Sequence, residues 1–114
     1  MLPRNRRLSD DKTIEKTKLS GKVYSDNVAS FIVDRKEKGS ETLFCVVVST
    51  KVSKKAVERN SVKRKVSLYL EKNLNRFNEG FNIVIIVKRD MLTIDQEETE
   101  KKLAELSESA NVIK

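Results

Sequence analysis

Three short runs of apolar residues along the chain predict β-strands. Between Val23 and Val33 apolar side chains fall on both faces of an extended segment, and a polar turn follows at residues 34–40. Residues 43–48 are apolar on both faces, which is typical of a central strand covered on at least one side. We therefore expect these two strands to form a hairpin, with the second strand inside the sheet.

The third apolar run, residues 83–87, also predicts a buried strand, and a long helix precedes it. This helix is predicted from Lys54 to about Phe77, with an apolar arc made of Val62, Val66, Tyr69, Leu70 and Phe77. At about 100° per residue, the opposite face carries Asn60, Lys63, Arg64 and Ser67. Because a long helix joins two buried strands, we expect these strands to be parallel neighbours in one sheet.

The N-terminal segment is predicted to be a basic arm followed by a helix. Residues 1–7 carry three arginines that repel one another, and Pro3 disfavours a helix, so a flexible, extended arm is expected. Ser9 can cap a helix that starts at Asp10. Gly21 ends this helix.

The C-terminal segment predicts a further helix. Thr93, with Gln96 three residues later, forms a capping box for a helix through Ala110, in which Leu103 and Leu106 pack inward. The resulting order is α-β-β-α-β-α, without internal repeats. At 114 residues the whole chain, 1–114, is expected to be one domain.

Composition limits the chemistry that the chain can perform. There are 24 Lys and Arg against 17 Asp and Glu, and no His, so the formal net charge is +7. The lack of His excludes Ser-His-Asp, Cys-His and His-metal sites. Cys45 is the only cysteine, which excludes an internal disulfide and indicates a reducing, cytoplasmic setting. Apolar stretches reach about seven residues, against roughly 20 for a membrane span, so no membrane segment is expected.

Positive charge is concentrated in one part of the chain. Residues 51–76 contain nine basic and two acidic residues, and their net charge of +7 equals that of the whole chain. Clustered Lys and Arg gain affinity for polyanions by releasing counterions from phosphates. A solubilising basic helix is the simpler alternative. Because no Gly-rich phosphate loop indicates a nucleotide site, a folded RNA backbone fits this segment better than a small ligand.

One motif in this segment identifies a family. Residues 56–64 read Ala-Val-Glu-Arg-Asn-Ser-Val-Lys-Arg and resemble the A-V-x-R-N-R-x-K-R signature of the bacterial ribonuclease P protein subunit. The resemblance extends over nearly the whole chain, from the Leu-Pro-basic start to the last helix. It implies an α/β (α+β) sandwich with a small mixed sheet (ribosomal protein S5 domain 2-like). It also implies a left-handed β-α-β crossover, against the usual right-handed rule.

The resemblance also implies a function. In this family a large RNA performs the magnesium-assisted removal of the 5′ leader from precursor tRNA, and the protein binds both that RNA and the leader. The implied partners are therefore ribonuclease P RNA and precursor tRNA, with Mg²⁺ bound mainly by the RNA. No catalytic or metal-binding residue is expected on the protein, which would be inactive alone, and no obligate protein partner is predicted.

Two sets of site residues follow from the resemblance. The expected catalytic-RNA contacts are Lys51, Lys54, Lys55, Arg59, Asn60, Lys63, Arg64 and Lys65. Ser61 departs from the signature, where the family has Arg, and Lys65 is a candidate replacement. The expected leader contacts are Ile14, Lys18, Tyr24, Phe31 and Ile32, with Ile14 and Lys18 at the positions of two family phenylalanines. For Phe31 and Ile32, an ordinary core position is an equal alternative.

Two other functions remain open from the residues alone. The first is a ribosomal-protein-like RNA-binding module without a role in tRNA processing. The second is a metal-dependent nuclease that uses the carboxylates at residues 10–11 and 97–100. Both acidic groups lie in the first turn of a predicted helix, where the helix dipole already explains them.

Overall fold

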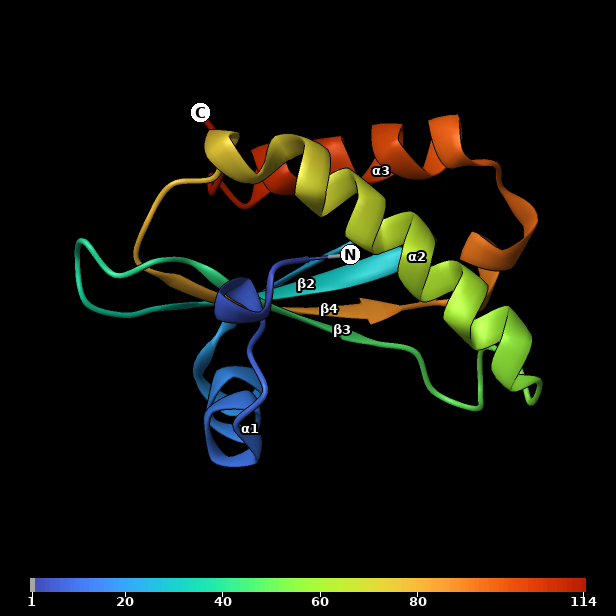
Figure 1. Cartoon of the computed structure of the whole chain (residues 1–114), viewed down its shortest axis with the longest axis horizontal. Coiled ribbons are helices and arrows are strands. Elements are labelled where there is room, and N and C mark those ends of the chain that lie inside the picture. The colour runs from blue at the N-terminus through green and yellow to red at the C-terminus, as the bar shows by residue number, and fades with distance from the viewer. Residues whose placement is uncertain (1) are drawn as a thin grey trace.

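The computed structural model describes residues 2–114, and Met1 lies outside the described residues. In chain order the elements are η1 (Arg4–Arg6), α1 (Asp11–Ser20), β1 (Lys22–Ser25), β2 (Ala29–Arg35), β3 (Leu43–Val47), α2 (Ala56–Asn73), η2 (Leu74–Arg76), β4 (Phe81–Val87), η3 (Arg89–Thr93) and α3 (Gln96–Ser109). The strands form one mixed sheet in the order β1-β2-β4-β3. Helices α2 and α3 cover one face, and α1 lies against the other (Figure 1). The predicted sandwich is confirmed.

The segment predicted as one strand from Val23 to Val33 is a hairpin of two strands. β1 and β2 pair antiparallel, and the chain turns at Asp26. The Asp26 Oδ1 atom accepts hydrogen bonds from the backbone N–H groups of Val28 and Ala29, at 2.8 and 3.0 Å. A short acidic side chain that bonds to the backbone just ahead of it favours a turn over a continuous strand.

The predicted hairpin of residues 23–33 with residues 43–48 is wrong, because β3 lies at an edge of the sheet beside β4. β4 takes the inner position between β2 and β3, and its Ile83, Val84 and Ile85 are fully buried. Most of β3 is only half-buried. The most apolar strand therefore occupies the centre, while the parallel pairing of β3 with β4 is confirmed.

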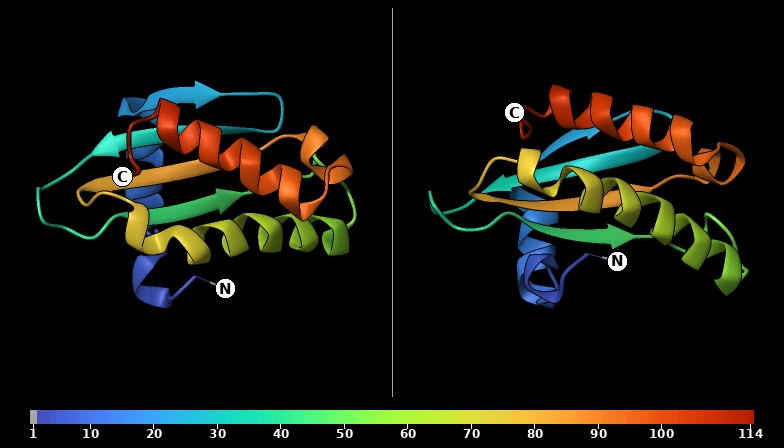
Figure 2. Two further views of the ribbon diagram at one scale, coloured as in Figure 1. Left: turned by 90° about the horizontal axis from the view of Figure 1, so that it is seen from above. Right: turned by 45° about the horizontal axis from the view of Figure 1, so that its top comes forward.

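The β3-α2-β4 crossover is left-handed. The left panel of Figure 2 looks onto the face covered by the helices, where β3 runs from left to right and α2 returns from right to left in front of the sheet. β4 then lies above β3 and parallel to it. Turned so that the strands point upward, this places β4 to the left of β3, opposite to the usual connection.

The N-terminal residues 2–7 are not an extended arm. Leu2 and Leu8 are 5% and 6% exposed, and the arginines between them form a single 3₁₀ turn. The Arg6 Nε atom donates to the carbonyl of Thr42 at 2.9 Å, and the Leu8 N–H donates to the carbonyl of Phe44 at 2.7 Å. Two buried leucines thus bind the segment to the edge strand β3, and their burial outweighs the repulsion among the arginines.

Both predicted helix caps are displaced toward an aspartate. Asp10, not Ser9, caps α1, and its Oδ2 atom accepts from the backbone N–H of Thr13 at 3.3 Å. Asp95, not Thr93, caps α3, because Thr93 belongs to the preceding 3₁₀ turn η3. Aspartate is as good an N-cap as serine or threonine, so neighbouring candidates are not separated by residue type alone.

The packing of α2 and α3 follows the predicted apolar positions. Val62, Val66 and Leu70 of α2 are buried against the sheet, and Leu103 and Leu106 of α3 join the same core. The α-helix α2 ends at Asn73, and Phe77 lies beyond it in the core with its ring edge-on to Phe44. Among the described residues, no helix is long and apolar enough to cross a membrane.

Candidate nucleic-acid interface

The helix α2 has one buried and one basic face, as predicted. While its apolar arc packs on the sheet, Asn60, Lys63 and Arg64 are exposed. These three polar side chains come from positions i, i+3 and i+4, which lie on one side of a helix. The side of α2 next to β3 therefore carries two positive charges and an amide group within one turn.

A groove of about 380 Å³ brings this side of α2 together with distant parts of the chain. Its walls are Leu2, Arg7, Leu8, Ser9, Phe44, Cys45, Val46, Asn60, Lys63, Arg64 and Ser67. The N-terminal segment, β3 and α2 each contribute one wall. A lining that combines cations and hydroxyl groups with apolar side chains suits a ligand that has both phosphates and bases.

The segment between β3 and α2 carries three further predicted contacts. Lys51, Lys54 and Lys55 are exposed in this segment, residues 48–55, at the N-terminal end of α2. Arg59 is only half-exposed, and its Nη1 atom donates to the backbone carbonyl of Ser53 at 2.9 Å. The structure thus places Arg59 behind the segment and the three lysines on its surface. We define the basic surface as Lys51, Lys54, Lys55, Arg59, Asn60, Lys63 and Arg64.

Lys65 does not belong to the basic surface. Its Nζ atom donates to the backbone carbonyls of Met91 at 3.2 Å and of Ile94 at 2.6 Å, in and after η3. One residue further along an α-helix turns the side chain by about 100°, which directs Lys65 toward α3 instead of the groove. The predicted replacement of the signature arginine by Lys65 is therefore wrong, and Ser61 leaves an exposed, uncharged position.

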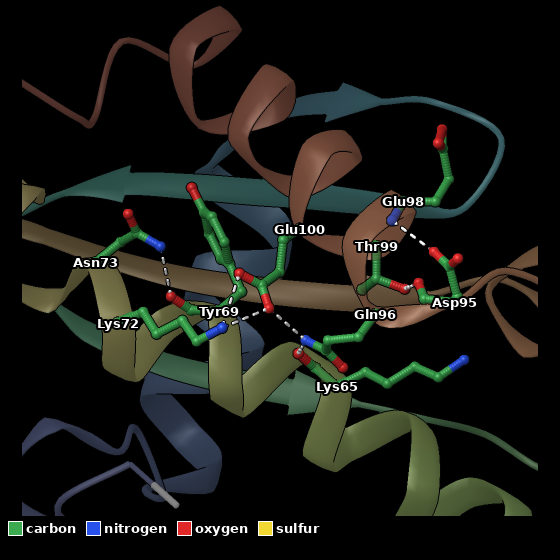
Figure 3. Close-up of polar contacts among 9 residues, drawn as sticks. All are labelled: Lys65, Tyr69, Lys72, Asn73, Asp95, Gln96, Glu98, Thr99 and Glu100. Atoms are coloured by element: carbon green, nitrogen blue, oxygen red, sulfur yellow. Dashed lines mark hydrogen bonds and ion pairs between the residues drawn. The ribbon is translucent and has the colours of Figure 1, made fainter.

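A polar seam joins α2 to α3 and fixes the basic surface against the rest of the molecule (Figure 3). The Gln96 side-chain amide donates to the carbonyl of Lys65 at 3.0 Å and to the Glu100 carboxylate at 2.8 Å. The same carboxylate pairs with Lys72 at 3.1 Å. Further along, the hydroxyl groups of Tyr69 and Ser107 are 2.9 Å apart in the buried interface.

A second surface lies on the opposite face of the sheet, around α1. Ile14 of α1 packs with the buried Ile32 of β2, while Cys45, Val47 and Ile86 beside them are half-buried. Phe31 and Tyr24 lie on the other face, in the core under α2 and α3, and Phe31 is 0% exposed. They are paired neighbours in the β1-β2 register, so both point away from α1. The structure therefore assigns Phe31 to the core and places Tyr24 away from the surface around α1, where the leader contacts were expected.

Cys45 marks the place where the two surfaces meet. Burial raises the pKa of its thiol, and the positive charges of Lys18 and Lys63 act in the opposite direction. Cys45 lines the groove together with Lys63 of α2, and it also packs against the same buried cluster as Ile14 of α1. The groove and the surface around α1 thus share this residue of the edge strand.

Comparison with known proteins distinguishes between the RNA-binding functions. The family model for ribonuclease P matches residues 2–111. The chain belongs to the ribonuclease P protein family. A ribonuclease P protein component from Finegoldia magna is 30% identical over 105 residues, which cover 92% of this chain and 90% of that protein. One from Synechocystis is 28% identical over 112 residues, which cover 98% and 90% of the two chains.

Solved structures of ribonuclease P proteins have the same fold. The protein from Staphylococcus aureus superposes with a TM-score of 0.87 at 15% identity, covering 96% of this chain and 98% of that one. The protein from Thermotoga maritima superposes with a TM-score of 0.78 at 23% identity, covering 88% and 93%. These similarities include the mixed sheet and its three α-helices.

Membership of the ribonuclease P family settles the broad function. The chain is a component of the tRNA 5′-processing enzyme, and its partner is ribonuclease P RNA. The alternative of a generic ribosomal-protein-like RNA-binding module is therefore wrong. Among the described residues, no group of three or more Cys, Asp or Glu side chains is arranged to hold a metal ion. Asp10 and Asp95 act as helix caps instead.

The sequence did not indicate every residue in or next to the groove between α2, β3 and the N-terminal segment. Arg7 and Ser9 line it because the N-terminal segment packs beside β3, with Arg7 in a bridge to Phe44. Arg89 lies next to the basic surface, and its Nη2 atom donates to the carbonyl of Lys51 at 3.2 Å. The basic character of all three segments was visible in the sequence, but their proximity depends on strand order.

Proposed function

We propose that this chain binds ribonuclease P RNA through the basic surface and assists it in removing the 5′ leader from precursor tRNA. The observation that carries the proposal is the groove in which Asn60, Lys63 and Arg64 of α2 meet Arg7 and Ser9 of the N-terminal segment. A guanidinium group offers a planar fork for phosphate, an ammonium group a mobile point charge, and the amide and hydroxyl groups both donate and accept hydrogen bonds.

The protein contributes to the reaction through electrostatics and organisation. Two polyanions, the catalytic RNA and the precursor tRNA, repel one another, and a chain of net charge +7 placed between them screens that repulsion. We assign a different RNA to each of the two surfaces. The basic surface and groove hold the catalytic RNA, while the surface around α1 holds the single-stranded leader.

In this proposal the leader contacts are Ile14, Ile32 and Lys18. Ile14 and Ile32 form the apolar part, beside the half-buried Cys45, Val47 and Ile86. Apolar contacts to bases combined with a cation near the phosphates are typical of single-strand binding. Where relatives stack bases on aromatic rings, this chain would use aliphatic contacts of lower specificity.

The chemistry itself is assigned to the RNA. Mg²⁺, bound mainly by the RNA, would supply the activated water for hydrolysis. The chain has no His, which is the usual general base near neutral pH, and Asp10 and Asp95 serve as helix caps. We therefore expect the protein alone to be inactive. The free thiol of Cys45 accords with the predicted cytoplasmic setting.

The test is cleavage of a precursor tRNA at low Mg²⁺ by the protein alone, a bacterial ribonuclease P RNA alone, and both together. The proposal expects 5′-mature tRNA only from the combined sample. The variant Lys63→Gln with Arg64→Gln should lose most of the stimulation. Lys101→Gln with Lys102→Gln removes the same charge from α3 and serves as the matched control.

Three results would contradict the proposal. Cleavage by protein alone, persisting after nuclease treatment to remove RNA, would assign catalysis to the protein. No stimulation of the RNA by the wild-type chain would separate it from this reaction. Equal loss of stimulation in both double variants would show that net charge alone matters and that the basic surface is not the contact site.

A further inference from the structure

The three lysines of the basic surface that precede α2 lie in a segment without regular structure. Residues 48–55 connect β3 to α2, and Lys51, Lys54 and Lys55 are exposed there. Among the described residues, none of these three ammonium groups forms an ion pair. The segment begins with a local turn, in which the Val52 N–H donates to the Ser49 carbonyl at 3.1 Å. Three like charges within five residues repel one another, so contacts beyond this turn are needed to hold the rest of the segment in one conformation.

Two arginines from different parts of the chain donate to backbone carbonyls of this segment. The Arg59 Nη1 atom donates to the carbonyl of Ser53 at 2.9 Å, and the Arg89 Nη2 atom donates to the carbonyl of Lys51 at 3.2 Å. Between them Val52 is 5% exposed and packs in the main core. Residues 51–53 are therefore held at three successive positions, one apolar and two through guanidinium groups.

The position of Arg89 follows from the strand order. β3 and β4 are parallel neighbours, so their C-terminal ends lie at the same edge of the sheet. Arg89 follows β4 by two residues, and Lys51 follows β3 by four. The crossover thus brings an arginine that is 38 residues away in sequence to the lysine-rich segment.

Ser53 adds a local contact to the same arrangement. Its hydroxyl group donates to the Glu58 carboxylate at 2.5 Å and accepts from the Lys55 N–H at 3.1 Å. Lys55 is the N-cap of α2 and makes no side-chain cap bond of its own. The first turn of α2 and the segment before it therefore share one hydrogen-bonded unit, in which Arg59 also takes part.

We propose that Arg59 and Arg89 are positioning residues that hold residues 51–55 in the conformation that presents Lys51, Lys54 and Lys55 to ribonuclease P RNA. This inference rests on the proposed function and deepens it. A guanidinium group has five N–H donors, so each arginine can hold a carbonyl and keep its charge near the RNA. Ordering the lysines before binding lowers the conformational entropy lost when the complex forms.

The test compares Arg89→Gln with Lys63→Gln in the full chain. Both remove one positive charge from the interface, but of these two residues only Arg89 bonds to the backbone of residues 51–55. The shorter side chain of glutamine lacks the guanidinium Nη2 donor that makes this bond. Amide hydrogen exchange of the free protein is measured first. We expect faster exchange at residues 51–55 in Arg89→Gln and unchanged exchange there in Lys63→Gln.

Binding to a bacterial ribonuclease P RNA is then measured against salt concentration. The slope of log K against log salt is negative, and losing one phosphate contact makes it shallower by about 0.7 to 0.9, which is the result expected for Lys63→Gln. Arg89→Gln should make the slope shallower by about twice as much as Lys63→Gln does, because the lysines lose their fixed positions. Arg59→Gln should act like Arg89→Gln in both measurements.

A double-mutant cycle with Lys54→Gln separates positioning from direct contact. If Arg89 acts through the segment, Lys54→Gln should weaken binding less in the Arg89→Gln background than in the wild type. Unchanged exchange in Arg89→Gln, a slope equal to that of Lys63→Gln, or additive effects in the cycle would overturn the positioning role. Failure of the wild-type chain to bind the RNA would instead overturn the proposed function, and this inference with it.

Discussion

At the scale of single residues, Ser61 is the clearest departure of this chain from its family. The residue is exposed on α2 between Asn60 and the pair Lys63 and Arg64, where the signature has an arginine. Ser61→Arg should strengthen binding to ribonuclease P RNA, because it adds one phosphate contact. It should also make the negative slope of log K against log salt steeper by about 0.7 to 0.9. Binding titrations at several salt concentrations measure both quantities.

The control for Ser61→Arg is Ser109→Arg, the same substitution at an exposed position at the end of α3. It adds the same charge far from the basic surface. Equal gains in affinity and slope from the two variants would show that the RNA responds to net charge and that position 61 is not a contact.

Lys63 and Lys65 are two residues apart in sequence and should behave in opposite ways. Lys65→Met removes an ammonium group that donates to two backbone carbonyls, so we expect it to lower the free energy of unfolding by about 1 to 2 kcal/mol. Its RNA-binding salt slope should stay unchanged. Lys63→Met should lower the slope and leave stability unchanged. Chemical denaturation measures the free energy of unfolding of both variants, and salt titration measures the salt dependence of their RNA binding. Equal changes in both quantities for Lys63→Met and Lys65→Met would refute the prediction.

At the scale of elements, the helices followed from the sequence more fully than the sheet. The apolar arc of α2 and the buried face of α3 depend on spacing within one segment, and they were predicted correctly. The order of strands depends on which apolar run buries best on both faces, and that competition between β3 and β4 is not local. The strand predicted to be central, β3, therefore lies at the edge, while β4 is buried as predicted.

The difference between patterns within one segment and the arrangement of strands in the sheet also explains which candidate site residues were misplaced. Asn60, Lys63 and Arg64 share a helical side and were grouped correctly. Tyr24 and Phe31 were assigned to the leader surface because strand residues can face either side, and a turn at Asp26 set the register that directs them into the core. Arg89 was not singled out, since only the parallel pairing of β3 with β4 brings it to the interface.

The helix α1 offers a test of the surface on the other face of the sheet. Lys18 is half-buried and its positive charge acts on the pKa of the Cys45 thiol, whereas Lys12 is exposed on the same helix. Lys18→Gln should weaken binding of leader-bearing precursor tRNA by the assembled holoenzyme several-fold and leave binding of mature tRNA unchanged. Lys12→Gln should change neither. Weaker binding of both RNAs by Lys18→Gln would assign Lys18 to the catalytic-RNA contact instead.

At the scale of the whole molecule, the free energy of unfolding should depend on pH in the alkaline range. The two groups responsible are the Cys45 thiol and the Tyr69 hydroxyl, which lie on opposite faces of the sheet. Burial raises the pKa of the Cys45 thiol from its ordinary value of 9.0 and that of the Tyr69 hydroxyl from 10.0. The unfolded chain then releases these protons at lower pH than the folded chain does. Their contribution to stability is complete below the unfolded values and is lost as the pH rises through the folded ones.

We therefore expect the free energy of unfolding to fall as the pH rises above about 9, with Cys45 acting first and Tyr69 next. Lys36 acts in the opposite direction, because burial lowers its pKa, but this side chain is only partly buried and its effect is small.

Tyr69→Phe should lower stability at neutral pH, since it removes the bond to Ser107, and it should flatten the alkaline decline of the free energy of unfolding. Cys45→Ala should flatten only its earlier part. Denaturant unfolding from pH 7 to 11 measures these profiles, and an unchanged decline in the double variant would show that lysine deprotonation, not these two groups, governs the loss.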